Sequence, residues 1–534
     1  MTPAAGRARP ANATRILANA LSGAGSRVAT MCVGFSLTPF IIGKLGIEQY
    51  GLWSVVGSLA GYLGLLDFGI GGAFVKFISE YAERDDRPSA RQVISFGMLF
   101  YAGIGLVFAL PVGLLAPDIV HAFKMPAASY AGAATLLRVM FALLVLTMIV
   151  NVPGMVLVAM QRMDIASRNN VLGYFAYAAA TVVLLKLGYG IYGIVASSAV
   201  QVLVTALLHF RSARNCFGDL WHDPRRFDAS IVRRLFGFGG WTQLTSIFQI
   251  VNLDVGRFIA AGIVSVASVG YYEIASKLAF LTRLFPSYLL NALLPAAAAA
   301  DARGDQSRLR RIYAAGTRYQ TFLTFASAGF LIAGADAIVR VWLGRPYPFV
   351  SQIIFWLCLG YAVNGLTGVG TTVMRAAGRP KYETGLTFVG AAVNLSATVV
   401  LARAYGIVGV AMATALGWLA GSVYFAIAFH RIRRTPFWAE IGWPLARMAC
   451  ACAFAAGLFY GLLHEPHVAR TFEHRFIGLG VLGVASAAYA LAFAALTWLF
   501  GVWRDDRPQL SARWREITIG ASARFSGRTL RREA

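Results

Sequence analysis

The chain has 534 residues, of which 58% are hydrophobic and 13% are charged, and its mean hydropathy is +0.63. Soluble proteins carry roughly 25% charged residues, so this composition excludes a soluble globular protein. The formal charge of +24 does not indicate nucleic-acid binding, because the basic residues form clusters separated by apolar stretches long enough to span a membrane.

Apolar stretches of membrane-spanning length recur along the whole chain. A bilayer core about 30 Å thick requires roughly 20 apolar residues per helix. The first stretch is too long for the apolar region of a signal peptide and is read as an uncleaved helix. The sequence predicts about fourteen spans, at 16–42, 51–76, 93–116, 133–159, 170–187, 190–210, 236–262, 270–297, 319–339, 350–374, 383–402, 406–429, 441–462 and 476–502.

The basic residues between these stretches predict the topology. Of the 48 lysines and arginines, 34 fall in the two tails and in alternate loops, whereas 8 fall in the other loops and 6 within spans. Positively charged loops stay on the cytoplasmic side. The alternation therefore predicts an even number of spans with the N- and C-termini both in the cytoplasm.

An internal repeat is visible at a nearly constant offset of 214 to 219 residues. The matching segments are 189–196 with 405–412, 160–162 with 374–375, and 50–53 with 269–272. These matches predict two copies of a six-helix unit in the same orientation, with a substrate cavity between them. The predicted parts are an N-terminal lobe (1–212), a cytoplasmic linker (213–234), a C-terminal lobe (235–434), two further helices (435–503) and a basic cytoplasmic tail (504–534).

Three motifs near the N-terminus carry a resemblance to a known family. They are Thr38-Pro39-Phe40, then Leu45-Gly46-Ile47-Glu48-Gln49-Tyr50-Gly51-Leu52-Trp53, then Leu66-Asp67-Phe68-Gly69-Ile70-Gly71. This pattern resembles the N-terminal signature of bacterial polysaccharide (Wzx-like) flippases, which share a superfamily with multidrug exporters of the MATE type and the peptidoglycan-precursor flippase. The specific similarity covers residues 35–90, and the layout extends over helices 1 to 12.

The resemblance implies an all-α fold in which two helical lobes form a V around a central cavity that opens alternately to each side. It also implies a substrate of undecaprenyl-pyrophosphate carrying a sugar repeat unit, which is moved from the inner to the outer leaflet of the bacterial cytoplasmic membrane. A polysaccharide polymerase and a chain-length regulator are the partners that such a role suggests, beside the membrane lipids. No cofactor is expected.

Charged residues inside predicted spans are functional candidates, because a charge at bilayer depth costs about 2.5 to 3.5 kcal/mol. Arg27 lies near the middle of the first span, with no acid within one turn. It either faces a wet cavity or pairs with Asp67 of the second span. Arg283 precedes Pro286 by three residues, where a kink favours a surface toward the cavity, although a packing role is equally compatible. Arg138 lies near the outer end of its span and is also explained by snorkelling.

Two further pairs combine opposite charges. Glu273 and Lys277 are four residues apart, and Asp254 and Arg257 are three apart, so each pair shares one helix face and can neutralise itself. Taken together, five cations within the spans (Arg27, Arg138, Arg257, Lys277 and Arg283) exceed the three acids (Asp67, Asp254 and Glu273) by two charges. Guanidinium and ammonium groups bind phosphate oxygens through charge-assisted hydrogen bonds. The net charge therefore favours a lipid pyrophosphate over a cationic drug, with Arg27, Arg138, Arg257, Lys277 and Arg283 as the candidate ligands.

Two further roles are open in the sequence, namely proton coupling and the stacking of sugars on aromatic rings. Asp67 and Glu273 are the acids expected to titrate if protons drive the cycle, unless Arg27 holds Asp67 permanently ionised. Trp53, Tyr62 and Tyr272 could stack on the sugars, although aromatic residues at helix ends are commonly interfacial.

Three classes of function fit an apolar chain of this kind. A membrane polymerase or ligase needs an extramembrane catalytic loop, and the predicted outer loops are short. The loop at 463–475 contains three histidines and two glutamates, but its spacing is not the HExxH zinc motif. A cation or drug antiporter shares the expected fold and differs in the charge of its cavity. The sequence therefore favours a flippase that is not an enzyme.

Overall fold

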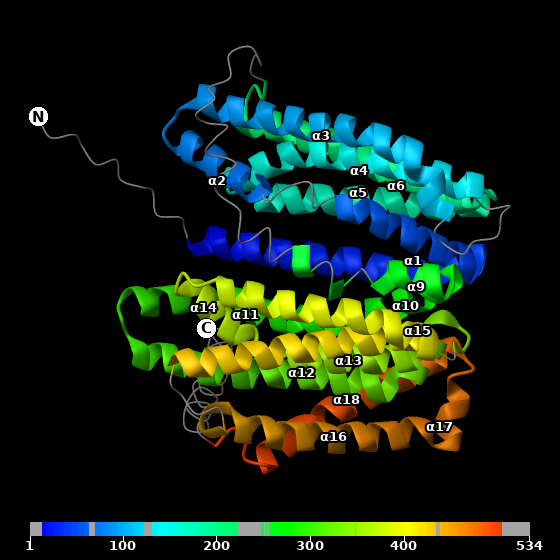
Figure 1. Cartoon of the computed structure of the whole chain (residues 1–534), viewed down its shortest axis with the longest axis vertical. Helices are drawn as coiled ribbons and strands as arrows, with labels where there is room; N and C mark the ends of the chain where they lie inside the picture. Colours follow the sequence, from blue (N-terminus) through cyan, green and yellow to red (C-terminus); the bar gives the residue numbers. More distant parts are fainter. Residues whose placement is uncertain are drawn as a thin grey trace, which may run out of the picture. The chain divides into compact units, whose positions relative to one another are not determined.

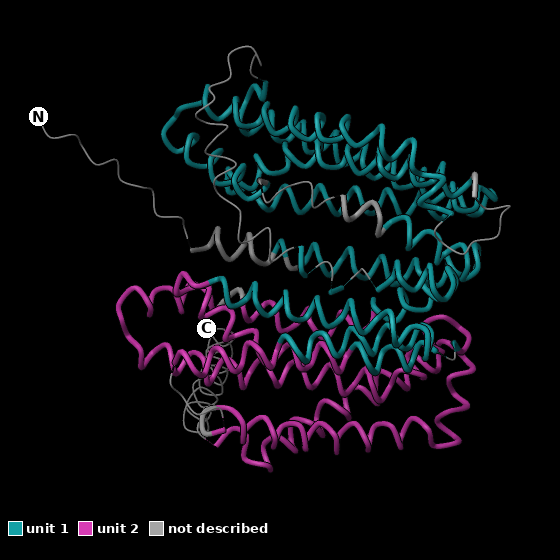
Figure 2. The backbone as a smooth tube through the Cα atoms, viewed as in Figure 1, with its two compact units in different colours: residues 1–277, 347–357, 380–421 teal, residues 278–346, 358–379, 422–534 magenta. Residues whose placement is uncertain are grey.

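The computed structural model describes residues 13–63, 70–121, 130–221, 247–249, 252–253, 256–347, 349–433 and 438–504. The chain divides into two compact units (Figure 2). Unit 1 contains residues 1–277, 347–357 and 380–421, and unit 2 contains residues 278–346, 358–379 and 422–534. The predicted linker at 213–234 and the basic tail at 504–534 lie largely outside the described residues, and the predicted division into two six-helix lobes stays a prediction.

Unit 1 begins with a long helix that is interrupted by a glycine. Helix α1 (Ala13–Leu63) spans 51 residues and is broken at Gly46, whose φ of 80° and ψ of 168° are not helical. A left-handed φ of this kind is open to glycine at little cost, so this residue separates the first predicted span from the second. The helices that follow are α2 (Ile70–Glu83), α3 (Arg87–His121), α4 (Tyr130–Ala159), α5 (Met163–Lys186) and α6 (Gly190–Phe217) (Figure 1).

Helices α2, α3, α4 and α6 enclose the hydrophobic core of the N-terminal bundle. Its largest buried members come from all four helices, and they include Phe74, Ile78, Tyr101, Val156 and Phe217. The opposite faces remain apolar: Leu106 on α3 is 78% exposed. An apolar core with an equally apolar surface is typical of a helix bundle in a lipid bilayer, where exposed leucines face acyl chains.

Helix α9 (Gly256–Ile263) and most of α10 (Val266–Ala279) also belong to unit 1, whose first stretch of chain ends at Lys277. The same unit contains most of α15 (Lys381–Arg433), which is broken at Gly406 with a φ of 59°. The two arms of α15 are antiparallel, because Gly390 packs against Gly417 and Leu386 against Gly421, with Leu401 against Gly409 beside the turn. The two arms of α15 therefore correspond to two predicted spans, 383–402 and 406–429.

Unit 2 contains the remaining helices. They are α11 (Leu281–Ala302), α12 (Gln306–Leu343), the second half of α13 (Val350–Gly365), α14 (Gly368–Ala376), the π-helical turn Trp438–Gly442, α16 (Trp443–His464), α17 (Pro466–Thr471) and α18 (Arg475–Leu499). An aromatic core joins α12, α16 and α18, with Phe459, Tyr489 and Phe493 among its buried members. Phe476 on α18, by contrast, is 88% exposed.

Nine helices among the described residues are long and apolar enough to cross a membrane, or ten if the bent pair 266–290 and 293–302 forms one span. The hairpin within α15 explains part of the difference from the predicted number, and most of the predicted span 236–262 lies outside the described residues. The count of fourteen thus stays a prediction. The all-α class is confirmed, and the chain is a multi-pass membrane protein.

Candidate functional site

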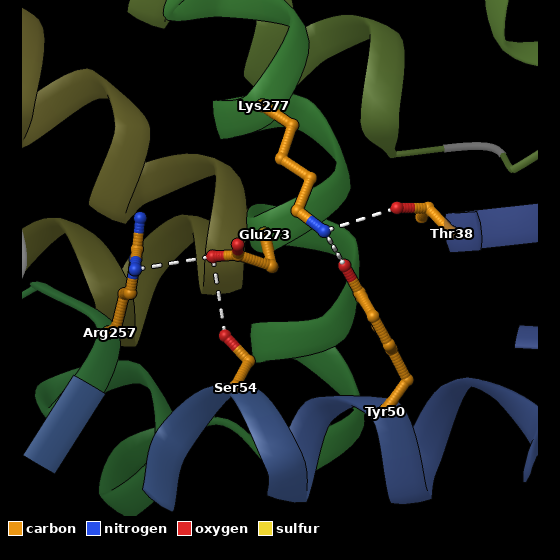
Figure 3. A network of polar contacts seen from close by, with 6 residues as sticks. All are labelled: Thr38, Tyr50, Ser54, Arg257, Glu273 and Lys277. Atoms are coloured by element: carbon orange, nitrogen blue, oxygen red, sulfur yellow. Dashed lines mark hydrogen bonds and ion pairs between the residues drawn. The ribbon is translucent and has the colours of Figure 1, made fainter. Parts of the chain in front are cut away.

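Three helices of unit 1, α1, α9 and α10, bring six polar side chains together (Figure 3). Thr38 lies on the first arm of α1, Tyr50 and Ser54 lie on its second arm, and Arg257 lies on α9. Glu273 and Lys277 lie one turn apart on α10. These six residues are called the α1–α10 cluster below.

The carboxylate of Glu273 has two partners in this cluster. Its Oε2 atom lies 3.2 Å from Nη1 of Arg257, and the two side chains are 18% and 17% exposed. The hydroxyl of Ser54 donates to the same oxygen at 3.3 Å. Glu273 therefore joins α9 and α10 to the second arm of α1. The ion pair expected between Glu273 and Lys277 is not formed, since Lys277 turns toward other groups.

The ammonium group of Lys277 is held by hydroxyls. It donates to Tyr50 Oη at 2.8 Å and to Thr38 Oγ1 at 3.2 Å. Tyr50 and Thr38 are buried, and Thr38 donates in turn to the main-chain oxygen of Gly34 at 2.8 Å. An ammonium group has three N–H donors. Two are used within the described part of the chain, so one donor is available to a further acceptor.

The cluster stands beside a close approach of two helix backbones. A Cβ atom on Gly270 would lie 2.7 Å from the main-chain oxygen of Ile47, and a Cβ atom on Gly51 would overlap the oxygen of Val266. Both positions therefore require glycine for steric reasons. Ile47 and Val266 are 219 residues apart, as are Gly51 and Gly270, so the two contacts are equivalent under the offset found in the sequence.

An exchange of equivalent contacts defines a local two-fold relationship between the second arm of α1 and α10. The hydrogen bond from Ser54 to Glu273 also joins residues 219 positions apart. The 219-residue offset of the sequence therefore recurs at this contact, where segments 47–54 and 266–273 face each other.

The other candidate cations occupy different surroundings. Arg138 donates through Nε at 3.0 Å and Nη2 at 2.9 Å to the main-chain oxygen of Gly113 on α3. Pro117 follows Gly113 by four residues and has no N–H to donate to that oxygen, so Arg138 satisfies a carbonyl that proline leaves open. Arg27 lies on an exposed face of α1.

Arg283 lies in unit 2, near the start of α11, and its guanidinium lies 5.3 Å from the ring centroid of Tyr361. This geometry is a cation–π contact. Asp67 and Asp254 lie outside the described residues, so their predicted pairings with Arg27 and Arg257 stay predictions.

The three aromatic residues suggested for sugar stacking differ in position. Tyr272 is buried, its hydroxyl lies 3.3 Å from Thr414 Oγ1, and the guanidinium of Arg257 lies 5.9 Å from its ring centroid. It therefore supports Arg257 within the packed interior. Trp53 is half-buried on the second arm of α1, and the side chain of Tyr62 lies outside the described residues.

The hydroxyl groups of the cluster were not singled out from the sequence. Thr38 and Tyr50 nevertheless belong to the N-terminal motifs, and Ser54 follows them directly. Their place in or directly after these motifs was the available signal. The acidic and histidine residues of the loop at 463–475 lie elsewhere: Glu465 caps α17 by accepting from the main-chain N–H groups of His467 and Val468.

Similarity to known proteins agrees with the N-terminal resemblance. The model of a family described as polysaccharide biosynthesis protein matches residues 49–352. A protein of Shigella flexneri described as an O-antigen transporter is 20% identical over 379 residues, which cover 70% of this chain and 88% of that protein. A protein of Haloferax volcanii described as a low-salt glycan biosynthesis flippase is 19% identical over 424 residues, with 79% and 84% covered.

Solved structures show the same fold. The lipid II flippase MurJ in an inward closed conformation has a TM-score of 0.69 at 14% identity, with 92% of this chain and 99% of that chain covered. An inward-facing MATE-family multidrug transporter has a TM-score of 0.60 at 14% identity, with 77% and 95% covered. The chain therefore belongs to the polysaccharide biosynthesis protein family, as its resemblance to polysaccharide flippases predicted, and has the fold that MurJ and MATE transporters share.

Proposed function

We propose that this protein is a flippase, not an enzyme, that moves undecaprenyl-pyrophosphate-linked oligosaccharide repeat units from the inner to the outer leaflet of the bacterial cytoplasmic membrane. The family match and the descriptions of the relatives support a role in glycan export. The observation that supports the substrate class is the third donor of Lys277, which no described residue accepts, beside the partly exposed pair of Arg257 and Glu273.

The charge balance of the cluster favours an anionic ligand. Two cations and one carboxylate leave a net positive charge within the described part of the site. Phosphate oxygens accept charge-assisted hydrogen bonds from ammonium and guanidinium groups. A pyrophosphate presents several such oxygens in a small volume, so it is a better acceptor for Lys277 than two neutral hydroxyls.

Competition for Lys277 provides a mechanism for alternating access. In the described conformation, Lys277 bonds to Tyr50 and Thr38, which keeps α10 close to both arms of α1. A pyrophosphate that captures the ammonium group weakens this link and stabilises a conformation in which the helices separate. A ligand shifts a conformational equilibrium by its difference in affinity for the two states. The substrate itself thus promotes the transition.

Transport into sealed vesicles tests this proposal. We would measure the movement of a fluorescent undecaprenyl-pyrophosphate oligosaccharide in proteoliposomes for wild type, Lys277→Gln and Arg257→Gln. Lys44→Gln is the matched control, because Lys44 is an exposed lysine on α1 outside the cluster. We expect a loss of about tenfold or more in both cluster variants, equivalent to about 1.4 kcal/mol, and wild-type rates in the control.

The antiporter alternative predicts a different result in the same vesicles. A cation exporter uses exposed carboxylates, so it would transport an organic cation against a proton gradient and leave the lipid-linked sugar unmoved. Its activity would depend on Glu273 more than on Lys277. That outcome would overturn the flippase proposal. The cytoplasmic position of both termini, and any partnership with a polymerase or a chain-length regulator, belong to the proposal as well.

A further inference from the structure

A histidine is buried in the N-terminal bundle, away from the α1–α10 cluster. His209 lies on α6 and is 2% exposed. Ala213 and Phe217, one and two turns further along the same face, are buried in the bundle core. A titratable side chain thus lies on the same helix face as the core residues Ala213 and Phe217.

The imidazole ring packs directly against the backbone of α4. A Cβ atom on Gly154 would lie 2.8 Å from both Nδ1 and Cε1 of His209, so only glycine leaves room for the ring. Gly154 follows Pro153 inside α4, where the absent N–H weakens the helix. The ring therefore fills a gap at a point where α4 is locally less constrained.

Both ring nitrogens are buried, and neither has a hydrogen-bond partner among the residues that the structure describes. The main-chain carbonyls of Val150 on α4 and Ala166 on α5 are the potential acceptors beside the ring. Neither of them forms a hydrogen bond with a ring nitrogen in this conformation. A neutral imidazole has one N–H and can satisfy one carbonyl, whereas an imidazolium has two N–H donors. Two acceptors around one ring thus match the protonated form.

No carboxylate is buried among the residues that the structure describes. Helix α4 has no charged residue from 139 to 159. The charged residues of α1, α5 and α6 at the same end of the bundle as His209 are exposed: Arg27, Asp164, Arg168, Arg211 and Arg214. Ala166 also lies in the first turn of α5, where the helix dipole opposes a cation. In the described packing, the neutral ring is therefore favoured.

A second polar pair adjoins the histidine. Asn169, which is fully buried on α5, donates to Ser212 Oγ on α6 at 3.2 Å, and Ser212 lies one turn from His209. The Oδ1 atom of Asn169 has no hydrogen-bond partner within the described residues. The α5–α6 interface thus contains several polar atoms that a small shift or an entering water could satisfy.

We propose that His209 is a proton-binding site of the N-terminal bundle, and that proton uptake there loosens the packing of α4 against α5 and α6. Protonation places a charge in an apolar contact without a counter-ion, which is unfavourable unless the groups rearrange. Movement at the Pro153–Gly154 step lets both N–H groups reach the carbonyls of Val150 and Ala166. The binding of one proton is thereby linked to a change in helix packing.

The experiment uses the full-length protein in lipid nanodiscs, without substrate, so that its outcome does not depend on the proposed transport function. The imidazole nitrogens of the seven histidines are labelled with nitrogen-15 and followed by NMR from pH 8 to pH 5, the range in which histidine charge changes. His209→Gln identifies the resonance, with His209→Asn as a second variant if the first does not fold. Hydrogen exchange of residues 149–158 and 163–170 is measured over the same range.

We expect the His209 resonance to change from the neutral to the imidazolium form as pH falls, and exchange in both segments to accelerate with the same midpoint. The acceleration should be lost in His209→Gln and His209→Asn and retained in His464→Gln, because His464 is exposed and contacts only its own helix turn through Tyr460 within the described structure. A resonance that stays neutral down to pH 5 would overturn the proposal. So would titration without any change in exchange.

Discussion

Ser54 and Glu273 are joined by a hydrogen bond of 3.3 Å, and they occupy adjacent, equivalent ends of two repeated segments. The contact places a charged group of the second repeat against a hydroxyl of the first. It lies next to the reciprocal contacts of Gly51 and Gly270. A close backbone approach of α1 and α10 therefore coincides with the charged residues Arg257, Glu273 and Lys277.

The ion pair of Arg257 and Glu273 is the first target for mutation. Glu273→Gln keeps an acceptor for Ser54 but removes the carboxylate that pairs with Arg257, so we expect a loss of about 1 to 3 kcal/mol in the free energy of unfolding. Denaturant titration in mixed micelles measures this quantity. Arg257→Gln combined with Glu273→Gln should cost less than the sum of the single changes, by about 0.5 kcal/mol or more. Strict additivity would contradict the pairing.

The glycine contacts predict a conformational effect. Gly51→Ala introduces a methyl group that overlaps the main-chain oxygen of Val266, so the second arm of α1 and α10 must move apart. We expect a lower melting temperature and faster hydrogen exchange in residues 266–277. Gly57→Ala is the matched control on the same arm, because nothing lies within 4 Å of its added methyl group. The control should be stabilising by about 0.5 to 1 kcal/mol, and a similar loss in both variants would contradict the close contact.

Much of this architecture follows from the hydrophobic pattern alone. Stretches of about 20 apolar residues predict the positions of most described helices. In a lipid bilayer the main-chain N–H and C=O groups of each span must form hydrogen bonds with one another, which a helix achieves. The connections were less predictable. A loop is expected between the spans 16–42 and 51–76, whereas α1 continues to Gly46 and resumes directly after it. One left-handed glycine replaces a longer turn, which a hydropathy profile does not distinguish.

The site was predictable in part for a similar reason. Charges inside spans are rare and costly, so Arg257, Glu273 and Lys277 stand out in the sequence. Their partners do not, because hydroxyl groups such as that of Ser54 are common in membrane helices and bond readily to their own backbone. The expected pairing of Glu273 with Lys277 rested on spacing within one helix. The observed partner, Arg257, comes from α9 and depends on the turn between the helices.

The start of α12 predicts a pH dependence outside the membrane-spanning segments. Asp305 caps this helix by accepting from the main-chain N–H of Arg308 at 2.9 Å and from the hydroxyl of Ser307 at 2.8 Å. These hydrogen bonds favour the carboxylate and lower the pKa of Asp305 below its usual value. The contribution to stability is therefore present above the unfolded-state pKa of about 3.9 and is lost as pH falls through the lower pKa of the folded state.

Melting curves between pH 7 and pH 3 test this cap. Asp305→Ala should melt at a lower temperature than wild type at neutral pH, and the difference should shrink as the pH falls and wild-type Asp305 takes up a proton. Asp305→Asn should retain much of the stability, because asparagine is also a good N-cap. A difference that stays constant down to pH 3 would show that the carboxylate charge contributes nothing.

Arg138 distinguishes a structural arginine from a substrate ligand. Its two hydrogen bonds to the oxygen of Gly113 replace the one that Pro117 cannot donate, so Arg138→Gln should destabilise the protein by about 1 kcal/mol. Transport per folded molecule should stay at the wild-type level. The same assays as for Lys277→Gln give both quantities side by side.

A second substitution separates the two roles of Arg138 more sharply. Pro117→Ala restores a main-chain N–H four residues after Gly113, so the freed oxygen regains a helical partner. In that background, Arg138→Gln should cost little further stability, because its acceptor no longer depends on the guanidinium. Loss of transport in the doubly substituted protein, despite restored stability, would instead assign Arg138 to the substrate and reverse the structural interpretation.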